Sequence, residues 1–551
     1  MSKTIIYQML PRLWGEGRMS SVDDATLSYL QGLGVTHLWC TGIIRHSTGQ
    51  PFVKGDAGSP YAISDYYDVC PYLADVPSRR ISEFRSLVRR VHSHGLRFVM
   101  DFVPNHVGCD YSDRFGGIPL CGWHDYDWSD TIKIDYSAPG TWETMYRIVR
   151  FWAAKGVDGF RCDMVELVPP EFLKWLIARI KEEFPSVIFI AEVYQKEKYR
   201  MYIEDVRFDY LYDKSGLYDV LRAVAAASGS VGYGAADAGS VGHGLVGSGA
   251  AGAGVDRLGS AECGTARAVT WNWQFLQDLQ PRMLNFLENH DEQRLASPWF
   301  AGRPDYYALL CASLMLNTAP FMLYFGQETG VDASEGHEGR TTIFNFARPA
   351  SLQRLCAFVH TPDCLRSLPD SACSLSSSVP DASGLSGAGE SLSAKELSVL
   401  THYRDALALA GSAAVSEGLT FDLCYCQSFE DGFDPDRHFA FLRHSAAAPV
   451  DSVSSGSVSG VSVSAGSVSA DSTSAGSVSS VFVPGVSVSA DFTSAGRGTT
   501  LLFVCNFSAS EARMTIRIPD HAVEYLGLAA NPCPSGRPVI VAPFGYVAIS
   551  I

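Results

Sequence analysis

Acidic residues stand at or just after the ends of three short, strand-like segments. Asp163 ends the segment GFRCD, Glu192 ends VIFIAE, and Asp291 follows MLNFL within the sequence ENHD. If the strands are parallel, their carboxyl ends share one edge and the three carboxylates converge there. Cleavage of a glycosidic bond with retention needs two carboxyl groups about 5 to 5.5 Å apart, one as nucleophile and one as acid. The three residues therefore predict a site of this kind.

The residues around these carboxylates suggest a division of roles. Arg161 lies two residues before Asp163, so both side chains share one face of a strand. A guanidinium there keeps the carboxylate ionised, as a nucleophile requires. Glu192 is then the candidate acid, provided that a less polar setting or neighbouring carboxylates raise its pKa. His106, His290 and the third carboxylate can hydrogen-bond sugar hydroxyls and stabilise an oxocarbenium-like transition state.

The elements that must position these residues form a regular series. Short runs rich in β-branched and aromatic residues alternate with segments of helical period, such as 82–94 and 170–184. The eight runs cover residues 4–7, 36–40, 97–102, 159–163, 187–192, 208–212, 283–287 and 321–324. Such alternation predicts βα units around a parallel sheet. Eight strands in order favour a (β/α)8 TIM barrel, and a doubly wound open sheet is the alternative.

The chain divides into two predicted domains. We expect a barrel domain over residues 1–410 and a C-terminal domain over 418–551, where segments such as HFAFLRH and TLLFVCNF predict an antiparallel β-sandwich. Low-complexity sequence interrupts both domains at 226–266, 363–393 and 445–497, and the last stretch repeats SVSADSTSAG as SVSADFTSAG. This composition cannot bury enough apolar surface to offset the entropy of ordering, so we interpret these stretches as loops. The stretch 445–497 falls between two strands, as a hairpin loop grown long.

Composition limits the partners of the protein. The chain has 551 residues, with 43 basic and 59 acidic side chains and a net charge of −16. This charge disfavours nucleic acid as a partner and permits neutral sugars. Fourteen scattered cysteines, and an N-terminal segment without the features of a secretory signal, indicate a cytoplasmic location. The apolar stretch 306–325 contains Asn317 and Pro320, and predicts a buried helix, a turn and a buried strand rather than a membrane span.

Four segments resemble, in order and spacing, the signature regions of the α-amylase family, glycoside hydrolase family 13. These segments are DFVPNH, GFRCDMVE, IAEV and ENHD. The family's secondary signatures are echoed by GVTHLW, SPYAISDYY and YFGQETG. The resemblance covers residues 4 to about 347 and implies a (β/α)8 barrel followed by a C-terminal β domain.

The resemblance implies a role for each matching residue. Asp163 corresponds to the nucleophile, Glu192 to the general acid/base, and Asp291 to the third carboxylate, which grips the sugar hydroxyls and distorts the ring. The residues expected around the reacting sugar are Arg161, His106, His290 and Tyr61, the last stacking on the sugar's apolar face. Asp101 matches a position that supports the site.

The departures from the family pattern concern calcium and the shape of the cleft. Glu166 and Leu167 stand where many members have Lys and His, which contact glucan and calcium respectively. Asn105 matches another calcium ligand, and Asp110, Asp113 or Asp125 could add oxygens nearby. We expect no cofactor for the chemistry and leave a structural calcium at Asn105 open. The segment 107–139 is short for the family's domain B, which would open or reshape the cleft.

These observations lead us to expect a retaining α-glycoside hydrolase of the α-amylase type, acting on α-linked glucose oligo- or polysaccharides. The same residues would serve a transglycosylase of the glucanotransferase or trehalose-synthase kind, in which a sugar hydroxyl replaces water as acceptor. A third alternative is a carbohydrate-binding barrel without catalysis. Such barrels usually lack a catalytic carboxylate, and all three are present here.

Overall fold

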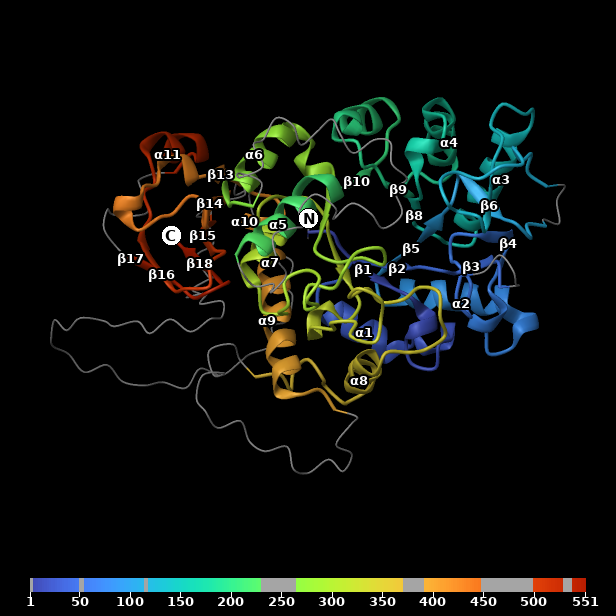
Figure 1. The fold of residues 1–551 in the computed structure, drawn as a ribbon, viewed down its shortest axis with the longest axis horizontal. Coiled ribbons are helices and arrows are strands. Elements are labelled where there is room, and N and C mark those ends of the chain that lie inside the picture. Colours follow the sequence, from blue (N-terminus) through green and yellow to red (C-terminus); the bar gives the residue numbers. More distant parts are fainter. Residues whose placement is uncertain are drawn as a thin grey trace, which may run out of the picture.

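Eight parallel strands close into a barrel in chain order (Figure 1). The computed structural model describes residues 3–48, 54–112, 117–228, 264–369, 391–446, 499–528 and 538–551. The barrel strands are β1 (Ile5–Met9), β2 (His37–Cys40), β5 (Arg97–Phe102), β8 (Gly159–Cys162), β9 (Ile188–Ala191), β10 (Tyr210–Tyr212), β11 (Met283–Phe286) and β12 (Phe321–Tyr324). Ile6 of β1 pairs with His37 on one side and Met322 on the other. This closure confirms the predicted (β/α)8 barrel and excludes an open sheet, which would have two unpaired edges.

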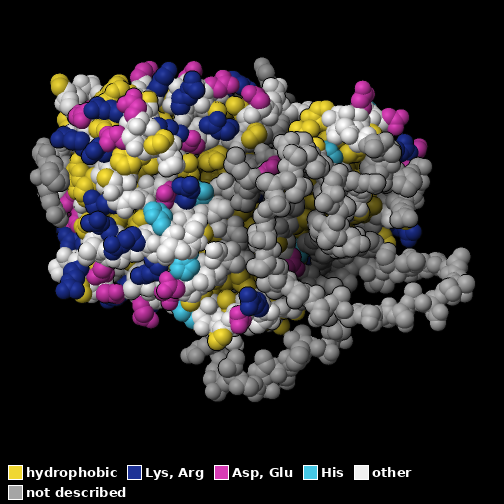
Figure 2. Space-filling model, turned by 180° about the vertical axis from the view of Figure 1, so that it is seen from behind, with side chains coloured by type: hydrophobic (Ala, Val, Ile, Leu, Met, Phe, Trp, Pro, Cys, Tyr) yellow, Lys and Arg dark blue, Asp and Glu magenta, His cyan; other side chains and the backbone are white. Residues whose placement is uncertain are grey.

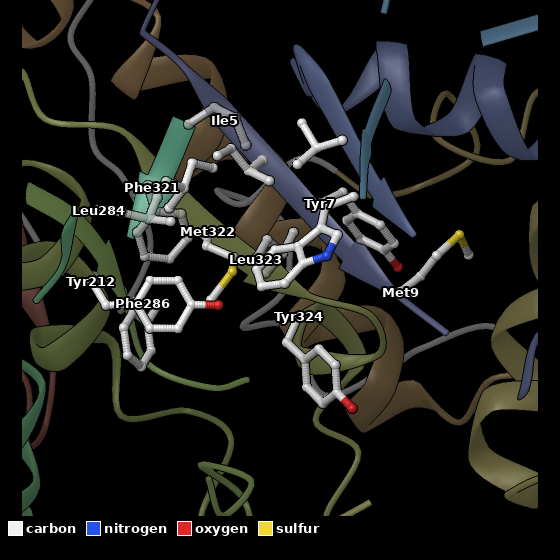
Figure 3. Close-up of a cluster of buried hydrophobic side chains, with 14 of the residues drawn as sticks. Ile5, Tyr7, Met9, Tyr212, Leu284, Phe286, Phe321, Met322, Leu323 and Tyr324 are labelled. Atoms are coloured by element: carbon white, nitrogen blue, oxygen red, sulfur yellow. The ribbon is translucent and has the colours of Figure 1, made fainter. Parts of the chain in front are cut away.

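The barrel strands are buried on both faces. Every residue of β1, β2, β8, β11 and β12 is buried, as expected for parallel strands that helices cover. Figure 3 shows part of this core, in which Tyr7 of β1, Tyr212 of β10 and Phe286 of β11 are at most 1% exposed. The rings of Tyr212 and Phe286 lie 5.3 Å apart. A tightly packed core fixes the strand ends that carry the site.

Helices cover the outside of the barrel (Figure 1). They are α1 (Asp24–Gly32), α2 (Arg80–Ser93), α3 (Thr141–Ala153), α4 (Pro170–Glu183), α5 (Asp219–Ala227), α6 (Arg267–Leu276), α7 (Tyr307–Leu314) and α8 (Ala350–Val359). The predicted helices 82–94 and 170–184 correspond to α2 and α4 to within two residues at each end. The stretch 306–325 forms the buried helix α7, a turn and β12, as predicted. No described helix is long and apolar enough to cross a membrane.

Two small antiparallel sheets follow the carboxyl ends of β2 and β5. The first pairs β3 (Ile44–His46) with β4 (Ile63–Val69), and the second pairs β6 (His106–Gly108) with β7 (Thr131–Lys133). In the second sheet His106 is opposite Lys133. The β6–β7 sheet lies within the segment 107–139 that we expected as a short domain B, apart from His106 at its start.

The C-terminal part of the chain forms two antiparallel sheets beside the barrel (Figure 1). After α9 (Ala394–Ala410) and α10 (Ala413–Ser416), β13 (Leu419–Asp422), β14 (His438–Ser445), β15 (Thr499–Asn506) and β18 (Tyr546–Ser550) form a four-stranded sheet. β16 (Ala512–Thr515) and β17 (Pro538–Val541) form a second sheet, with α11 (Asp520–Leu526) between them in sequence. Ser445, the last residue of β14, is opposite Thr499, the first of β15.

Cys424 and Cys426 lie in a 3-10 turn after β13. Trp271 and Trp273 belong to helix α6. The low-complexity stretches 226–266, 363–393 and 445–497 lie largely outside the described residues, so their interpretation as loops stays a prediction.

Charged side chains of both signs are interspersed on the described part of the face in Figure 2. Lysine and arginine alternate there with aspartate and glutamate rather than forming a continuous basic band. A phosphate backbone requires such a band. The pattern on this face is therefore in keeping with the acidic net charge of the chain.

Candidate active site

The guanidinium of Arg161 lies at the centre of four carboxylates. Its Nη1 is 2.6 Å from Asp163 Oδ1 and 3.6 Å from Asp101 Oδ1. Its Nη2 is 2.7 Å from Glu192 Oε1 and 4.0 Å from Asp291 Oδ2. The Arg161 side chain is fully buried, whereas that of Asp291 is 34% exposed. The structure thus brings the three predicted catalytic carboxylates together at the carboxyl ends of β8, β9 and β11.

The carboxylate of Glu192 is held at both oxygens. Oε2 accepts a hydrogen bond of 2.9 Å from the backbone N–H of Met164, and Oε1 accepts one of 2.9 Å from the hydroxyl of Tyr194. Met164 directs its N–H at Glu192 from a left-handed backbone conformation, with φ 43° and ψ 45°. This conformation is uncommon for a residue other than glycine and is typical of functional sites. The turn after β8 therefore positions a group on β9.

Burial and the neighbouring charges together give the carboxyl groups different pKa values. It raises the pKa of Glu192 to about 7, and the charges of Asp163 and Asp291 act in the same direction, against Arg161. Burial also raises the pKa of Asp163, which the neighbouring Arg161 opposes. Although burial acts to raise it, the pKa of Asp291 lies below its usual value because His290 and Arg161 stabilise its charge. Glu192 is thus the group suited to hold a proton near neutral pH.

His290 and Tyr61 form one wall of the site. Their rings stack with centroids 5.3 Å apart at 20°, and His290 Nε2 lies 3.0 Å from Asp291 Oδ2. Burial acts to lower the pKa of His290, but the charge of Asp291 and the contact with it raise it overall. On the opposite side of the ring, Nδ1 lies 2.7 Å from the amide Nε2 of Gln8. Two elements, β1 and the turn after β11, therefore fix this imidazole.

Asp101 is buried among these groups. Besides its ion pair with Arg161, it accepts hydrogen bonds of 3.2 Å from Trp39 Nε1 and of 3.2 Å from the Tyr61 hydroxyl. Burial raises its pKa. Asp101 thus contacts three side chains of the site, in keeping with the supporting position we expected from the sequence.

His106 lies on the domain B side of the site, at the start of β6. Burial lowers its pKa to about 4, so the ring is neutral near pH 7. Its Nδ1 is 3.3 Å from the amide nitrogen of Asn105, and its ring centroid is 5.3 Å from that of Trp128. Because an amide nitrogen only donates, Nδ1 accepts and the ring proton is on Nε2.

Parts of the chain are similar to proteins of the α-amylase type. The sequence profile of the α-amylase catalytic domain matches residues 15–116. An α-1,4-glucan:maltose-1-phosphate maltosyltransferase from Cereibacter sphaeroides is 30% identical over 223 residues, 35% of this chain and 32% of that protein. α-Amylase 3 from Dictyoglomus thermophilum is 22% identical over 232 residues, 35% of this chain and 44% of that protein. Over the matched parts, these comparisons support the resemblance to the α-amylase family that the sequence motifs indicated.

A solved structure supports the same fold for the described residues. A maltogenic α-amylase from Thermotoga neapolitana superposes with a TM-score of 0.58 at 18% identity, covering 100% of this chain and 96% of that one. At this identity the likeness shows the fold alone. The match to the Cereibacter sphaeroides maltosyltransferase spans only 32% of that protein's length.

The side chain of Asn105, which we expected as a possible calcium ligand, already has two hydrogen-bond partners. Asn105 Oδ1 accepts a hydrogen bond of 3.1 Å from Lys133 Nζ, and its Nδ2 donates one of 2.8 Å to Asp125. Among the described residues, no group of three His, Cys, Asp or Glu side chains is placed to hold a metal ion. Asn105 and its neighbours therefore do not fit a calcium ion in this structure.

Glu166, which replaces the family's lysine, has a different use here. Its Oε2 accepts a hydrogen bond of 2.8 Å from the backbone N–H of Tyr194, and Oε1 accepts one of 3.3 Å from that of Gln195. Lys198 forms a longer ion pair with it, at 3.9 Å. Glu166 thus holds the loop after β9, from which Tyr194 reaches Glu192.

Sequence reasoning missed four residues that shape the site: Gln8, Trp39, Met164 and Tyr194. Tyr194 had a usable signal, because it follows the candidate acid by two residues and carries a hydroxyl donor. Met164 had none, because nothing in a methionine indicates a left-handed backbone. Gln8 contacts His290, 282 residues later, and Trp39 contacts Asp101, 62 residues later, and the closed barrel brings each pair together.

Proposed function

We propose that the protein is a retaining α-glycosidase that cleaves α-linked glucose oligomers or polymers by double displacement. The observation that carries this proposal is the arrangement around Arg161, which pairs with Asp163 at 2.6 Å while Glu192, 2.7 Å away, has a pKa of about 7. One carboxyl is thus paired as an anion, and its neighbour can hold a proton. Retaining cleavage requires this combination of nucleophile and acid.

The proposed reaction has two steps. Asp163 attacks the anomeric carbon and forms a glycosyl ester, while Glu192 gives its proton to the departing glycosidic oxygen. Glu192 then takes a proton from a water molecule, whose oxygen attacks the same carbon and releases the sugar from Asp163. Asp291, with His290 beside it, is available to bind hydroxyl groups of the ring that reacts.

Aromatic residues near these groups support a sugar as ligand. Tyr61, stacked on His290, offers a ring for the apolar face of a hexose. On the domain B side, Trp128 packs at 5.3 Å from His106 and at 5.0 Å from Tyr126, which is 42% exposed. We propose that Tyr61 contacts a sugar on one side of the scissile bond and that Trp128 and Tyr126 contact a sugar on the other side.

The first test is product analysis by chromatography after incubation with starch, maltotriose, isomaltose, sucrose or trehalose. Short maltooligosaccharides from starch would identify an endo-acting amylase, and glucose from one disaccharide would identify the linkage. Asp163→Asn should abolish turnover of every substrate while leaving binding intact. Glu192→Gln should keep cleavage of α-glucosyl fluoride, whose leaving group needs little protonation. Glu143→Gln, on the outer helix α3, is the control that should behave as wild type.

The leading alternative is glycosyl transfer, which the maltosyltransferase relative favours. In that reaction a sugar hydroxyl, rather than water, takes the glycosyl group from Asp163. Incubation of α-glucan with and without added maltose, and with maltose 1-phosphate as donor, separates the two reactions. Products longer than the substrate would favour transfer, whereas release of reducing ends alone favours hydrolysis.

A carbohydrate-binding barrel without catalysis is the third candidate. It requires that the wild type and Asp163→Asn bind sugars equally and leave all substrates unchanged. The raised pKa of Glu192 speaks against it, because a binding site gains nothing from a carboxyl group that titrates near neutral pH. We also propose a cytoplasmic location, which the eleven free cysteines of the described residues support.

A further inference from the structure

Lys133 Nζ lies among three oxygen atoms in the short domain B. The distances are 3.1 Å to Asn105 Oδ1, 3.0 Å to Asp125 Oδ1 and 2.8 Å to Asp125 Oδ2. The side chains of Lys133 and Asp125 are only 17% and 13% exposed. An ammonium group has three N–H donors, and each has one oxygen here. The cluster is therefore complete with the lysine as its cation.

The same cluster suits calcium poorly. Calcium takes six to eight oxygen ligands at about 2.3 to 2.6 Å. Here the amide of Asn105 supplies one oxygen, and its backbone carbonyl already accepts a hydrogen bond from Ile134. The ring of Trp123 covers the ammonium from another side, with its centroid 5.2 Å from Nζ. An indole face stabilises a cation without offering it an oxygen.

Lys133 connects separate pieces of the chain. It stands on β7 opposite His106 of β6, Asn105 follows β5 in the barrel, and Asp125 and Trp123 belong to the loop between β6 and β7. A positive charge at this point therefore joins the hairpin, its loop and the barrel. Such a connection is the structural task of a bound divalent ion in a small insertion.

The ammonium also determines how Asn105 faces the active site. Because Lys133 can only donate, it requires the amide oxygen of Asn105, which leaves the amide nitrogen toward Asp125 and His106. The amide nitrogen in turn requires Nδ1 of His106 as acceptor. The cation thus fixes the tautomer of a neutral histidine in the site.

We propose that Lys133 is a built-in cation that takes the place of a structural calcium ion in domain B and makes the fold of this region independent of divalent metal. The proposal concerns stability and does not depend on which sugar the protein acts on. It predicts that the cluster accepts no calcium while the lysine is present, and that loss of the lysine loosens the insertion.

The test uses thermal unfolding of the full chain in EDTA and in millimolar CaCl2, together with metal analysis after dialysis. We expect the wild type to unfold at the same temperature in both solutions and to retain less than one calcium per chain. Lys133→Met, which keeps the apolar stem, should lower the unfolding temperature by several degrees. Lys181→Met is the matched control, because Lys181 pairs with both oxygens of Asp209 on the outside of the barrel.

Two results would overturn the proposal. One is a wild type that binds one calcium per chain and unfolds several degrees lower in EDTA. The other is a Lys133→Met variant as stable as the wild type, or no less stable than Lys181→Met. If Lys133→Met fails to fold, Lys133→Arg keeps the charge and should remain folded and insensitive to EDTA, and calcium dependence of that variant would count against the idea.

Discussion

Arg161 is a single positive charge with four carboxylates within 4.0 Å of its nitrogen atoms. It cannot neutralise all of them, and like charges at such distances disfavour full ionisation. The excess negative charge falls when one carboxyl group takes up a proton. Glu192, with a pKa of about 7, is the group that can hold this proton near neutral pH. The acidity of Glu192 is therefore set first by its burial and then by the charges of the neighbouring carboxylates.

This arrangement predicts a pH dependence. Glu192 must be protonated in the free enzyme to act as acid, so kcat/KM should fall about tenfold per pH unit above a pKa of about 7. Tyr194 donates to Glu192 and favours the charged form, so Tyr194→Phe should move this basic limb upward by about one pH unit. The measurement is kcat/KM against pH on one soluble substrate.

A control separates this effect from the general loss of a tyrosine hydroxyl. Tyr146→Phe removes a hydroxyl that contacts Glu183 on the outside of the barrel, and it should leave the pH profile unchanged. A basic limb that stays in place in Tyr194→Phe, or that moves downward, would show that the Tyr194 hydroxyl does not stabilise the charged form of Glu192.

At the scale of the element, the turn after β8 contains a residue, Met164, with a left-handed backbone conformation that is strained for a side chain with a Cβ. Met164 has a left-handed conformation and donates its N–H to Glu192, and Glu166, two residues later, holds the backbone of the loop after β9. Two consecutive strand ends are thus tied to each other by backbone groups on both sides. The position of Glu192 depends on this tie as much as on its own strand.

Substitutions at Met164 should reveal the strain. Met164→Gly keeps the N–H and removes the Cβ that disfavours positive φ, so the variant should keep its activity and lose little or no stability. Met164→Val places a β-branched residue there and should cost about 1–2 kcal/mol of unfolding free energy, with lower kcat. Chemical unfolding of both variants measures the difference. Equal stability of the two would show that the turn is not strained.

The sequence predicted the barrel strands and the carboxylates at their ends better than it predicted contacts between residues far apart in the chain. The barrel strands were predictable because burial on both faces leaves continuous apolar runs, and Asp163 and Glu192 because they end such runs. The spacing of Trp271 and Trp273 does not reveal that they belong to helix α6, because a pair of residues two apart occurs in strands and helices alike. The contact of Lys133 with Asn105, 28 residues earlier, depends on the register of a hairpin that no local pattern specifies.

At the scale of the whole molecule, the barrel and the C-terminal sheet share one apolar core. Tyr306, just before α7, donates a hydrogen bond of 2.8 Å to the carbonyl of Phe507, and its ring lies 4.7 Å from that of Phe544. Phe441 and Phe503, stacked at 4.9 Å in the sheet, belong to the same buried cluster as the barrel strands. The two parts should therefore unfold together, because separating them would expose α7 to water.

The low-complexity stretch between β14 and β15 should be dispensable for the fold. Ser445 and Thr499 face each other as a strand pair, so a short hairpin turn can join the two strands there. Replacement of residues 447–498 by a four-residue turn containing Asn-Gly should change the unfolding temperature little and leave activity unchanged. Calorimetry and a starch assay are the measurements. A variant that does not fold would show that the stretch contributes contacts to the protein.

The pairing of Ser445 with Thr499 also bears on how the gene has changed. Because the chain leaves and re-enters the sheet at neighbouring positions, each doubling of the connection costs only about 0.6 kcal/mol in closure entropy. Copying errors at this point are then nearly invisible to selection on stability. The near-identical decapeptides SVSADSTSAG and SVSADFTSAG are the pattern that such a duplication leaves. A duplication at this point changes the stability of the fold too little to be removed by selection.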